Sequence, residues 1–371
     1  MDVVIYLIAM VISQMNKREW KEFQVGGDEG LFEVKSSICE IDLKNLNLEN
    51  GSVPYITRSN VNNGIAKYVT EKQNGYSRNR GNVITIGLDT QTIFYQPINF
   101  FTGQNIQIID HEKMSKDVAN FLIPLFRIQM EKFNWGGNGA TLKRLNALKI
   151  MLPVDNNGNP DWDYMEHLGR SIYYKQNKDI LGYLVKKMDT LEEEVKNKIL
   201  SENIEWGLWT IGRLFNIKRV SGRTFESYDK GCFPYITTSS QRNGVNGFVR
   251  AVEEDISFRN SLTISPIDGT VFYHSFDFVG RGGAGSSIIT LTNKYLNKYT
   301  GLFIKTAIEC SSRAKASYGV QLNGDRLKAT KFKLPINKEG NPDWGYMELY
   351  MKKMEYKKLD EVIVYLKNKE F

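Results

Sequence analysis

The side chains that usually perform covalent or metal chemistry are scarce in this 371-residue chain. None of its histidines or cysteines has a second histidine or cysteine at metal-ligand spacing, and an odd number of distant cysteines fits no disulfide framework. We therefore expect no zinc site and no serine–histidine–aspartate triad, and no metal or other cofactor is predicted. Free thiols also agree with a reducing, cytoplasmic location. The residues concerned are Cys39, Cys232, Cys310, His111, His167 and His274.

Two motifs around residue 160 imitate known sites, but each lacks an essential residue. The phrase NPDW at 159–162 is similar to the [ND]PP[YFW] loop of amino-group DNA methyltransferases, which holds a flipped base. Asp161 replaces the second proline of that loop, and no strand with a glycine-rich cofactor turn precedes the phrase at a suitable distance. Residues 155–166 also place oxygen-bearing side chains as in a calcium loop, but Pro160 stands where the sharp turn requires glycine.

Two further motifs have the wrong structural context. GRGGAG at 280–285 satisfies the G-x-G-x-x-G pattern, but SSIITLTN follows with strand character where a dinucleotide site needs a helix. A plain turn, or a flexible loop that approaches DNA phosphates, is expected there. Asp161, Glu194 and Lys196 imitate a PD-(D/E)xK nuclease site, yet they fall on one predicted helix instead of adjacent strands. No competent active site is therefore predicted.

Polar side chains that could read DNA bases occur in two matched segments, TRSNVNNG at 57–64 and TTSSQRNG at 237–244. Each segment follows a PYI strand. In the major groove, Arg can bond bidentately to guanine, and Asn or Gln to adenine. An ordinary polar turn is the alternative for any one of these residues. The candidate base-reading residues are Thr57, Arg58, Ser59, Asn60, Asn62, Asn63, Thr237, Thr238, Ser239, Gln241, Arg242 and Asn243.

Basic residues elsewhere could contact the phosphate backbone without regard to base sequence. The formal net charge of +7 favours an anionic partner such as nucleic acid. Each basic residue alone is as compatible with a solvated surface as with a phosphate contact. The candidate phosphate-binding residues are Arg78, Arg80, Lys143, Arg144, Arg281, Arg313, Lys315 and Arg326.

The matched segments belong to an internal repeat that covers most of the chain. LPVDNNGNPDWDYMEHL at 152–168 and LPINKEGNPDWGYMELY at 334–350 share ten of seventeen residues. PYITRSNVNNGIAKYV at 54–69 and PYITTSSQRNGVNGFV at 234–249 share eight of sixteen residues. The chain therefore contains two homologous units of about 180 residues each.

Strand and helix patterns recur in the same order in both units. Residues 83–103 and 261–281 alternate apolar and polar residues around an Asp-containing turn, which indicates strands and hairpins. A long amphipathic helix is expected at about 163–201, and a shorter apolar stripe runs from 347 to 366. The apolar positions of the long helix are Leu168, Ile172, Ile180, Leu184, Met188, Leu191, Val195 and Ile199.

The doubled NPDW phrase is expected to begin these two helices. Asn159 can cap the first helix, Pro160 suits its first turn, and Asp161 favours the positive end of the helix dipole. Residues 341–343 repeat this arrangement.

The predicted fold class is α+β, with two homologous β-rich domains separated by long α-helices that pair as a coiled-coil-like spacer. The apolar run from Val3 to Ile12 is too short to span a bilayer and lacks a basic start, so a packed helix is expected there and no membrane association. The expected segments are an N-terminal apolar helix at 1–18, a first domain at 19–153, a central spacer helix at 154–203, a second domain at 204–335 and a C-terminal spacer helix at 336–371.

The pattern EW…PYITxSxxxNG…FY…LP…GNPDWxYME followed by a helix, present twice, resembles the DNA-specificity (S) subunits of type I restriction–modification systems. The form LP…GNPDWxYME is particularly similar to specificity subunits of type IIB and related systems. The resemblance implies a non-catalytic subunit with two target recognition domains, each of which reads one half of a split site in double-stranded DNA. It also implies that the helices set the spacing and dock methyltransferase or combined methyltransferase–endonuclease subunits.

Two other classes of function stay open at this point. A stand-alone DNA methyltransferase or nuclease would bind S-adenosylmethionine or cut DNA as the purified chain. A duplicated scaffold that binds protein or carbohydrate would select no DNA sequence. Selection of a bipartite sequence from random DNA is expected only of a specificity subunit.

Overall fold

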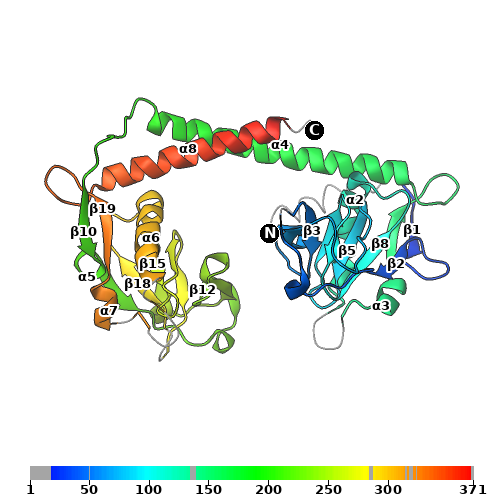
Figure 1. Ribbon diagram of the computed structural model, residues 1–371, viewed down its shortest axis with the longest axis horizontal. Coiled ribbons are helices and arrows are strands. Elements are labelled where there is room, and N and C mark those ends of the chain that lie inside the picture. The colour runs from blue at the N-terminus through cyan, green and yellow to red at the C-terminus, as the bar shows by residue number, and fades with distance from the viewer. Residues whose placement is uncertain are drawn as a thin grey trace. The chain divides into compact units, whose positions relative to one another are not determined.

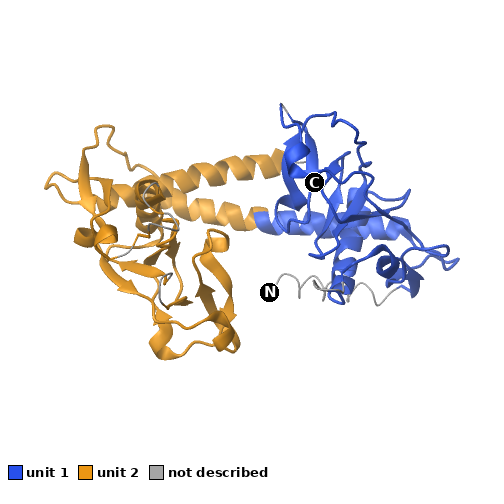
Figure 2. Ribbon diagram, turned by 60° about the horizontal axis from the view of Figure 1, so that its bottom comes forward, with its two compact units in different colours: residues 1–180, 371 blue, residues 181–370 orange. Residues whose placement is uncertain are grey.

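The computed structural model describes residues 18–49, 51–133, 139–283, 287–313, 316, 321–322 and 324–368. The predicted apolar helix at 1–18, apart from Arg18, and the candidate Lys315 lie outside these residues. The chain divides into two compact units, unit 1 with residues 1–180 and 371 and unit 2 with residues 181–370 (Figure 2). Across the described ranges, no helix combines the length and the apolar character that a membrane span requires.

Unit 1 is built of small sheets whose strands are mainly antiparallel (Figure 1). Its strands are β1 (Trp20–Gln24), β2 (Glu33–Ser36), β3 (Val53–Ile56), β4 (Ile65–Val69), β5 (Val83–Gly87), β6 (Ile93–Gln96), β7 (Phe101–Thr102), β8 (Ile106–Asp110) and β9 (Lys149–Pro153). The first strand, β1, pairs with β9, which closes the domain just before the long helix. The other sheets have the orders β2-β8-β5-β6 and β4-β3-β7, and β3 and β7 run parallel.

Helices cover the sheet of β5 and β8 and form the core of unit 1 with it. They are α2 (Lys116–Met130), α3 (Leu142–Asn146) and α4 (Trp162–Val195). The hydroxyl of Ser115 caps α2 by accepting a hydrogen bond from the Val118 amide at 3.2 Å. Phe126 of α2, Ile109 of β8 and Met165 of α4 belong to one buried cluster. The sequence patterns predict β-strands here but do not predict α2.

Unit 2 repeats this arrangement, which confirms the predicted duplication and the α+β class. Its strands are β10 (Trp206–Thr210), β11 (Asn216–Arg219), β12 (Lys230–Ile236), β13 (Val245–Val249), β14 (Ile256–Ser257), β15 (Ser261–Ile264), β16 (Val271–His274), β17 (Phe278–Gly280), β18 (Ile289–Thr292) and β19 (Lys331–Pro335). Its helices are α5 (Ile211–Leu214), α6 (Lys298–Ser312), α7 (Gly324–Lys328) and α8 (Trp344–Asn368). β10 pairs with β19, and the larger sheets have the orders β11-β18-β15-β16 and β13-β12-β17-β14.

The doubled NPDW phrase begins α4 and α8, as predicted, through its aspartate. The Asp161 carboxylate accepts a hydrogen bond from the Tyr164 amide at 3.0 Å. Asp343 accepts the corresponding bond from Tyr346 at 2.8 Å. Each aspartate therefore satisfies one of the free amides in the first turn of its helix.

The expectation that Asn159 caps the helix, with Pro160 in its first turn, is wrong. Both residues belong to a turn that precedes the helix, where Pro160 pairs with Val154. The Asp155 carboxylate organises this turn by accepting hydrogen bonds from the amides of Asn157 and Asn159 at 2.8 and 2.9 Å. Because these bonds hold Asn159 in the turn, the helix begins two residues after Pro160.

The tryptophan of the phrase fastens each helix to its own domain. Trp162 stacks on His111, with ring centroids 4.2 Å apart and ring planes 20° from parallel. Trp344 stacks in the same way on Tyr295 at 5.2 Å. In both units the phrase therefore starts a helix and anchors that helix to its domain.

The long helix α4 is shorter than expected. It ends at Val195, and Asn197 then adopts a left-handed φ of 64°, a conformation that commonly terminates helices. Ile199 therefore lies beyond the helix and is 91% exposed, and Ile180 within it is 50% exposed. The predicted continuous apolar stripe is wrong at these two positions. The buried positions instead form an early and a late group, Met165, Leu168 and Ile172 and then Leu191 and Val195.

The late part of α4 pairs with α8 inside unit 2, side by side in Figures 1 and 2. Lys187 forms an ion pair with Glu355 at 2.6 Å, and Glu194 forms one with Lys352 at 2.5 Å. Residue numbers rise along α4 as they fall along α8, so the two helices are antiparallel. Lys298 of α6 also reaches Glu355 at 2.8 Å, which ties the helix pair to the domain. The predicted pairing of the long helices is confirmed in this unit.

We expect Gly169→Ala to destabilise unit 1. A Cβ atom at Gly169 of α4 would lie 1.9 Å from the carbonyl oxygen of Asp117 in α2, so the two helices would have to separate. A loss of about 1–3 kcal/mol in the free energy of unfolding is expected, measured by urea denaturation. Gly182→Ala in the same helix is the control, because a Cβ there meets nothing within 4 Å. Equal stability of the two variants would contradict this packing account.

Candidate nucleic-acid interface

The two segments predicted to read bases form closed loops of the same construction. The loop of residues 57–64 joins β3 to β4, and the loop of residues 237–244 joins β12 to β13. In the first loop, the Thr57 amide donates to the Gly64 carbonyl at 2.8 Å. The Thr237 amide donates to the carbonyl of Gly244 at the same distance. We call these two segments the recognition loops.

Three consecutive left-handed residues end each recognition loop. Asn62, Asn63 and Gly64 have φ values of 51°, 54° and 77°. The corresponding values for Arg242, Asn243 and Gly244 are 50°, 56° and 77°. Glycine and asparagine adopt this conformation readily, whereas other side chains are strained in it. The repeated φ values show that both loops follow the same backbone path into the next strand.

Hydrogen bonds from asparagine side chains hold the loops against the neighbouring hairpins. The Asn63 amide group donates to the Tyr95 carbonyl at 3.0 Å, and the Asn243 amide group donates to the Tyr273 carbonyl at 3.4 Å. In unit 1, the side chain of Gln96 also donates to the Asn63 carbonyl at 3.2 Å. The asparagines predicted to read bases at these two positions therefore serve to position the loop.

The threonines that open the loops also have internal partners. The hydroxyl of Thr57 accepts a hydrogen bond from the Ser59 amide at 3.4 Å, and Thr237 accepts one from Ser239 at 3.3 Å. Arg58 is paired with Asp89, so its charge is compensated within unit 1. These contacts occupy the polar groups nearest the strands, and the residues in the middle of each loop carry most of its exposed polar groups.

The middle of each loop is exposed and differs between the units. In the first loop the exposed residues are Asn60, Val61 and Asn62. In the second loop they are Ser239, Ser240, Gln241 and Arg242, while Thr238 is half-buried. We call residues 60–62 and 240–242 the loop tips. The structure thus separates the candidate base-reading residues into a shared frame and two unlike tips.

Arg281 lies beside the recognition loop of unit 2. Its amide donates to the Ile236 carbonyl at 2.8 Å, directly before Thr237 begins the loop. The bond from Gly103 to Ile56 at 2.9 Å is its counterpart in unit 1. Because β12 and β17 are parallel, the segments that follow them leave the same end of the sheet. The side chain of Arg281 is exposed there, which suits a phosphate contact next to the loop.

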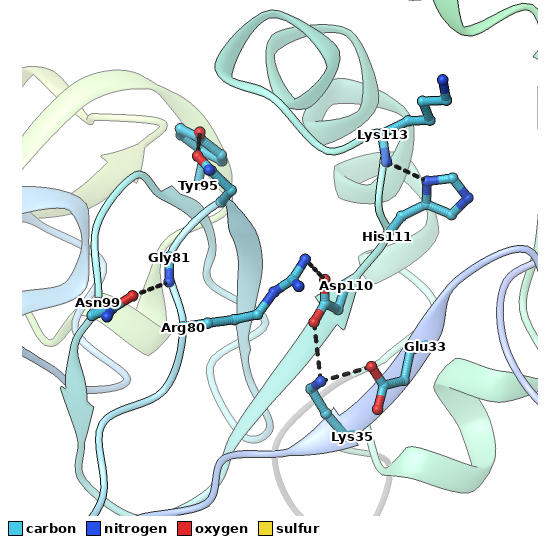
Figure 3. A network of polar contacts seen from close by, with 10 residues as sticks. Glu33, Lys35, Arg80, Gly81, Tyr95, Asn99, Asp110, His111 and Lys113 are labelled. Atoms are coloured by element: carbon cyan, nitrogen blue, oxygen red, sulfur yellow. Dashed lines mark hydrogen bonds and ion pairs between the residues drawn. The ribbon is translucent and has the colours of Figure 1, made fainter.

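The candidate Arg80 is held by a buried carboxylate. Arg80 reaches Asp110 at 2.6 Å and Lys35 reaches it at 3.0 Å, as Figure 3 shows. The Asp110 side chain is only 4% exposed, and buried charged groups are usually paired in this way. The ion pair with Asp110 therefore gives Arg80 a structural role that needs no contact with DNA.

The remaining phosphate candidates differ in how much of their charge is free. Arg313 pairs with Glu309 at 2.9 Å. Arg144 donates to the Gly139 carbonyl at 2.9 Å, and Arg326 donates to that of Gln321 at 3.0 Å, an equivalent contact in the other unit. By contrast, Arg78 and Lys143 are exposed. Neither has an ion pair with any residue that the structure describes.

Two matched residues at the ends of β6 and β16 were not predicted as part of the site. Gln96 bonds Thr85 at 3.0 Å, and His274 occupies the same place in unit 2, where its Nε2 lies 2.8 Å from the Thr263 hydroxyl. The Nδ1 atom of His274 has no hydrogen-bond partner, and the residue is fully buried. Burial lowers the pKa of His274 from 6.5 to about 4. The matched FYQ and FYH ends of the repeat were the available signal.

The neutral, buried His274 makes unit 2 sensitive to acid. As the pH falls from 6.5 towards 4, only the unfolded chain takes up a proton at this residue, so the folded state loses stability over that window. We expect His274→Gln to remove about 2 kcal/mol of the destabilisation between pH 7.5 and pH 5, measured by urea denaturation with hydrogen exchange of β15 and β16. The exposed His167→Gln is the control. An unchanged acid sensitivity in His274→Gln would contradict the assignment.

The described parts of the chain contain no group of three or more His, Cys, Asp or Glu side chains that could hold a metal ion.

Relatives of known type match the chain over most of its length. It is 29% identical over 315 residues to the type II restriction enzyme BgcI specificity subunit S.BcgI of Heyndrickxia coagulans, a match that covers 83% of this chain and 87% of that protein. Among solved structures, the S subunit of a type I restriction–modification system from M. genitalium is 17% identical, with a TM-score of 0.46 and coverage of 95% and 93%. The HsdS subunit from Thermoanaerobacter tengcongensis is 11% identical, with a TM-score of 0.31 and coverage of 95% and 92%.

The decisive match is to a protein family. The sequence pattern of the family called type I restriction modification DNA specificity domain matches residues 17–182 and again residues 203–363. The two matches coincide with the two copies of the repeat. Since together they span most of the chain, this protein belongs to the type I restriction modification DNA specificity domain family.

Proposed function

We propose that this chain is the DNA-specificity subunit of a restriction–modification complex, in which each unit recognises one half of a bipartite site in double-stranded DNA. The observation that carries the proposal is the pair of recognition loops, which share one backbone frame and differ at their exposed tips. A shared frame presents side chains in the same geometry, and unlike tips then select unlike bases. Two half-sites of different sequence are the expected outcome.

The chain acts in this proposal as a DNA-recognition component and not as the enzyme. The family to which it belongs is one of DNA specificity domains, and its relative from Heyndrickxia coagulans is named as a specificity subunit. Methyl transfer and cleavage then come from separate methyltransferase or combined methyltransferase–endonuclease subunits. A cytoplasmic location, where such a complex meets DNA, is part of the same proposal.

The long helices offer a surface for those partner subunits. Tyr183 of α4 is 64% exposed, and Val362 and Val364 of α8 are nearly half exposed. These apolar side chains are accessible to a partner subunit. We propose that a methyltransferase subunit covers this part of the helices.

The proposed function predicts a two-part DNA motif. The complex of the full chain with its cognate methyltransferase should enrich, from a random DNA pool, two fixed half-sites separated by a constant gap. The purified chain alone should neither methylate nor cleave DNA. A single continuous motif would contradict independent reading by two units, and methyl transfer by the pure chain would support the enzyme alternative. Absence of any enriched sequence would favour a scaffold that does not bind DNA.

A further inference from the structure

Most left-handed residues of this protein other than glycine are asparagines, and Arg242 is one of two exceptions among the described residues. Among the described residues other than glycine, nine have positive φ, and seven of these are asparagine. The exceptions are Gln91 and Arg242. An arginine has no local advantage in this conformation, because its Cβ is crowded and its side chain is too long to bond the adjacent backbone as asparagine does. A residue that breaks a local rule at an exposed position is a candidate for function.

The other unit shows what the local structure prefers at this place. Asn62 has a φ of 51°, compared with 50° for Arg242, and its side chain donates to the Ile65 carbonyl at 3.0 Å. Asparagine therefore satisfies both the backbone angle and a hydrogen bond. One of the two N–H donors of its amide group is therefore used within the loop.

Arg242 makes no such contact and has no ion pair with any residue that the structure describes. Its side chain is exposed, and its neighbours in the tip, Ser240 and Gln241, carry no charge that would neutralise it. The backbone on either side is fixed, since the Gly244 amide bonds the Gln241 carbonyl at 2.8 Å and Asn243 bonds the hairpin. The loop thus holds an unpaired guanidinium on a rigid support.

We infer that Arg242 is a specificity-determining residue that reads a guanine in the half-site of unit 2, an inference that rests on the proposed function. A guanidinium donates two parallel hydrogen bonds to O6 and N7 of guanine, a pattern that the other bases do not offer. A fixed loop backbone makes this contact selective, because the side chain loses less freedom on binding. The corresponding residue of unit 1, Asn62, is an asparagine that uses one of its amide donors within the loop and carries no charge.

The inference is tested with Arg242→Asn in the full chain, assembled with its cognate methyltransferase. Asparagine suits the left-handed backbone and can form the bond seen at Asn62, so the unfolding temperature should equal or exceed that of the wild type. Affinity for the cognate site should fall about 10- to 100-fold. The selected motif should lose its preference for guanine at one position in the half-site of unit 2, and the other half-site should be unchanged.

Two further variants separate base reading from charge and from folding. Arg242→Lys keeps the charge but lacks the planar fork, so it should keep the salt dependence of binding and lose the preference for guanine. Arg250→Asn removes the same charge from an exposed residue at the far end of β13. It should leave the base preference at every position of the motif unchanged.

The outcomes distinguish this inference from the proposed function. If the wild-type complex selects a bipartite motif and Arg242→Asn selects the same motif with full affinity, the inference is wrong and the proposed function stands. A lowered unfolding temperature with equal loss at both half-sites would show a structural role for Arg242 and would also overturn the inference. A wild-type complex without a two-part motif would overturn the proposed function and the inference with it.

Discussion

The left-handed run that ends each recognition loop is the constraint on which the candidate interface depends. Three successive residues with positive φ turn the chain sharply between two strands, and only asparagine and glycine do this without strain. Asn63 and Asn243 then fix the turn to the next hairpin with a side-chain hydrogen bond. The frame is consequently the same in both units, and the sequence is free to change only where the loop is exposed.

Charge compensation decides which basic residues can serve DNA. The net charge of +7 suggests a basic surface, but several arginines are committed to carboxylates of their own unit. Asp110 is the clearest example, because a buried carboxylate holds both Arg80 and Lys35. Arg281 and Arg242 lack such partners among the described residues and lie at one end of the same sheet. A count of basic residues alone therefore overestimates the number of cations that are available to phosphate groups.

Most of the fold could be predicted from the sequence because the repeat exposes it twice. Alternation marked the strands around β5 and β15, and the apolar spacing marked α4 and α8. The sequence predicts the helix cap at Asn159 because several residues that can cap a helix follow one another from Asp155 to Asp161. Only the hydrogen bonds to Asp155 show that Asn157 and Asn159 belong to the preceding turn. The end of α4 was misplaced because a single asparagine, Asn197, overrides an apolar pattern that continues to Ile199.

The two polar loops could be located from the sequence, but the contacts of their individual residues could not be predicted. Composition identified the recognition loops correctly as polar and unlike, yet it could not separate Asn63, which holds the loop, from Asn60, which is exposed. That separation depends on tertiary contacts with Tyr95 and Gln96, which lie more than thirty positions away in the chain. The burial of His274 could not be predicted for the same reason, since it depends on the packing of β15 and β16 in the folded unit.

The central claim is that the tips on a common frame carry the base specificity, and a loop transplant tests it most directly. The measurement is the methylated motif of the assembled complex after residues 240–242 are replaced by the tip of unit 1, Asn-Val-Asn. The account predicts that the half-site of unit 2 changes towards the preference of unit 1, while the other half-site and the gap are kept. An unchanged motif, or a change in both half-sites together, would contradict it.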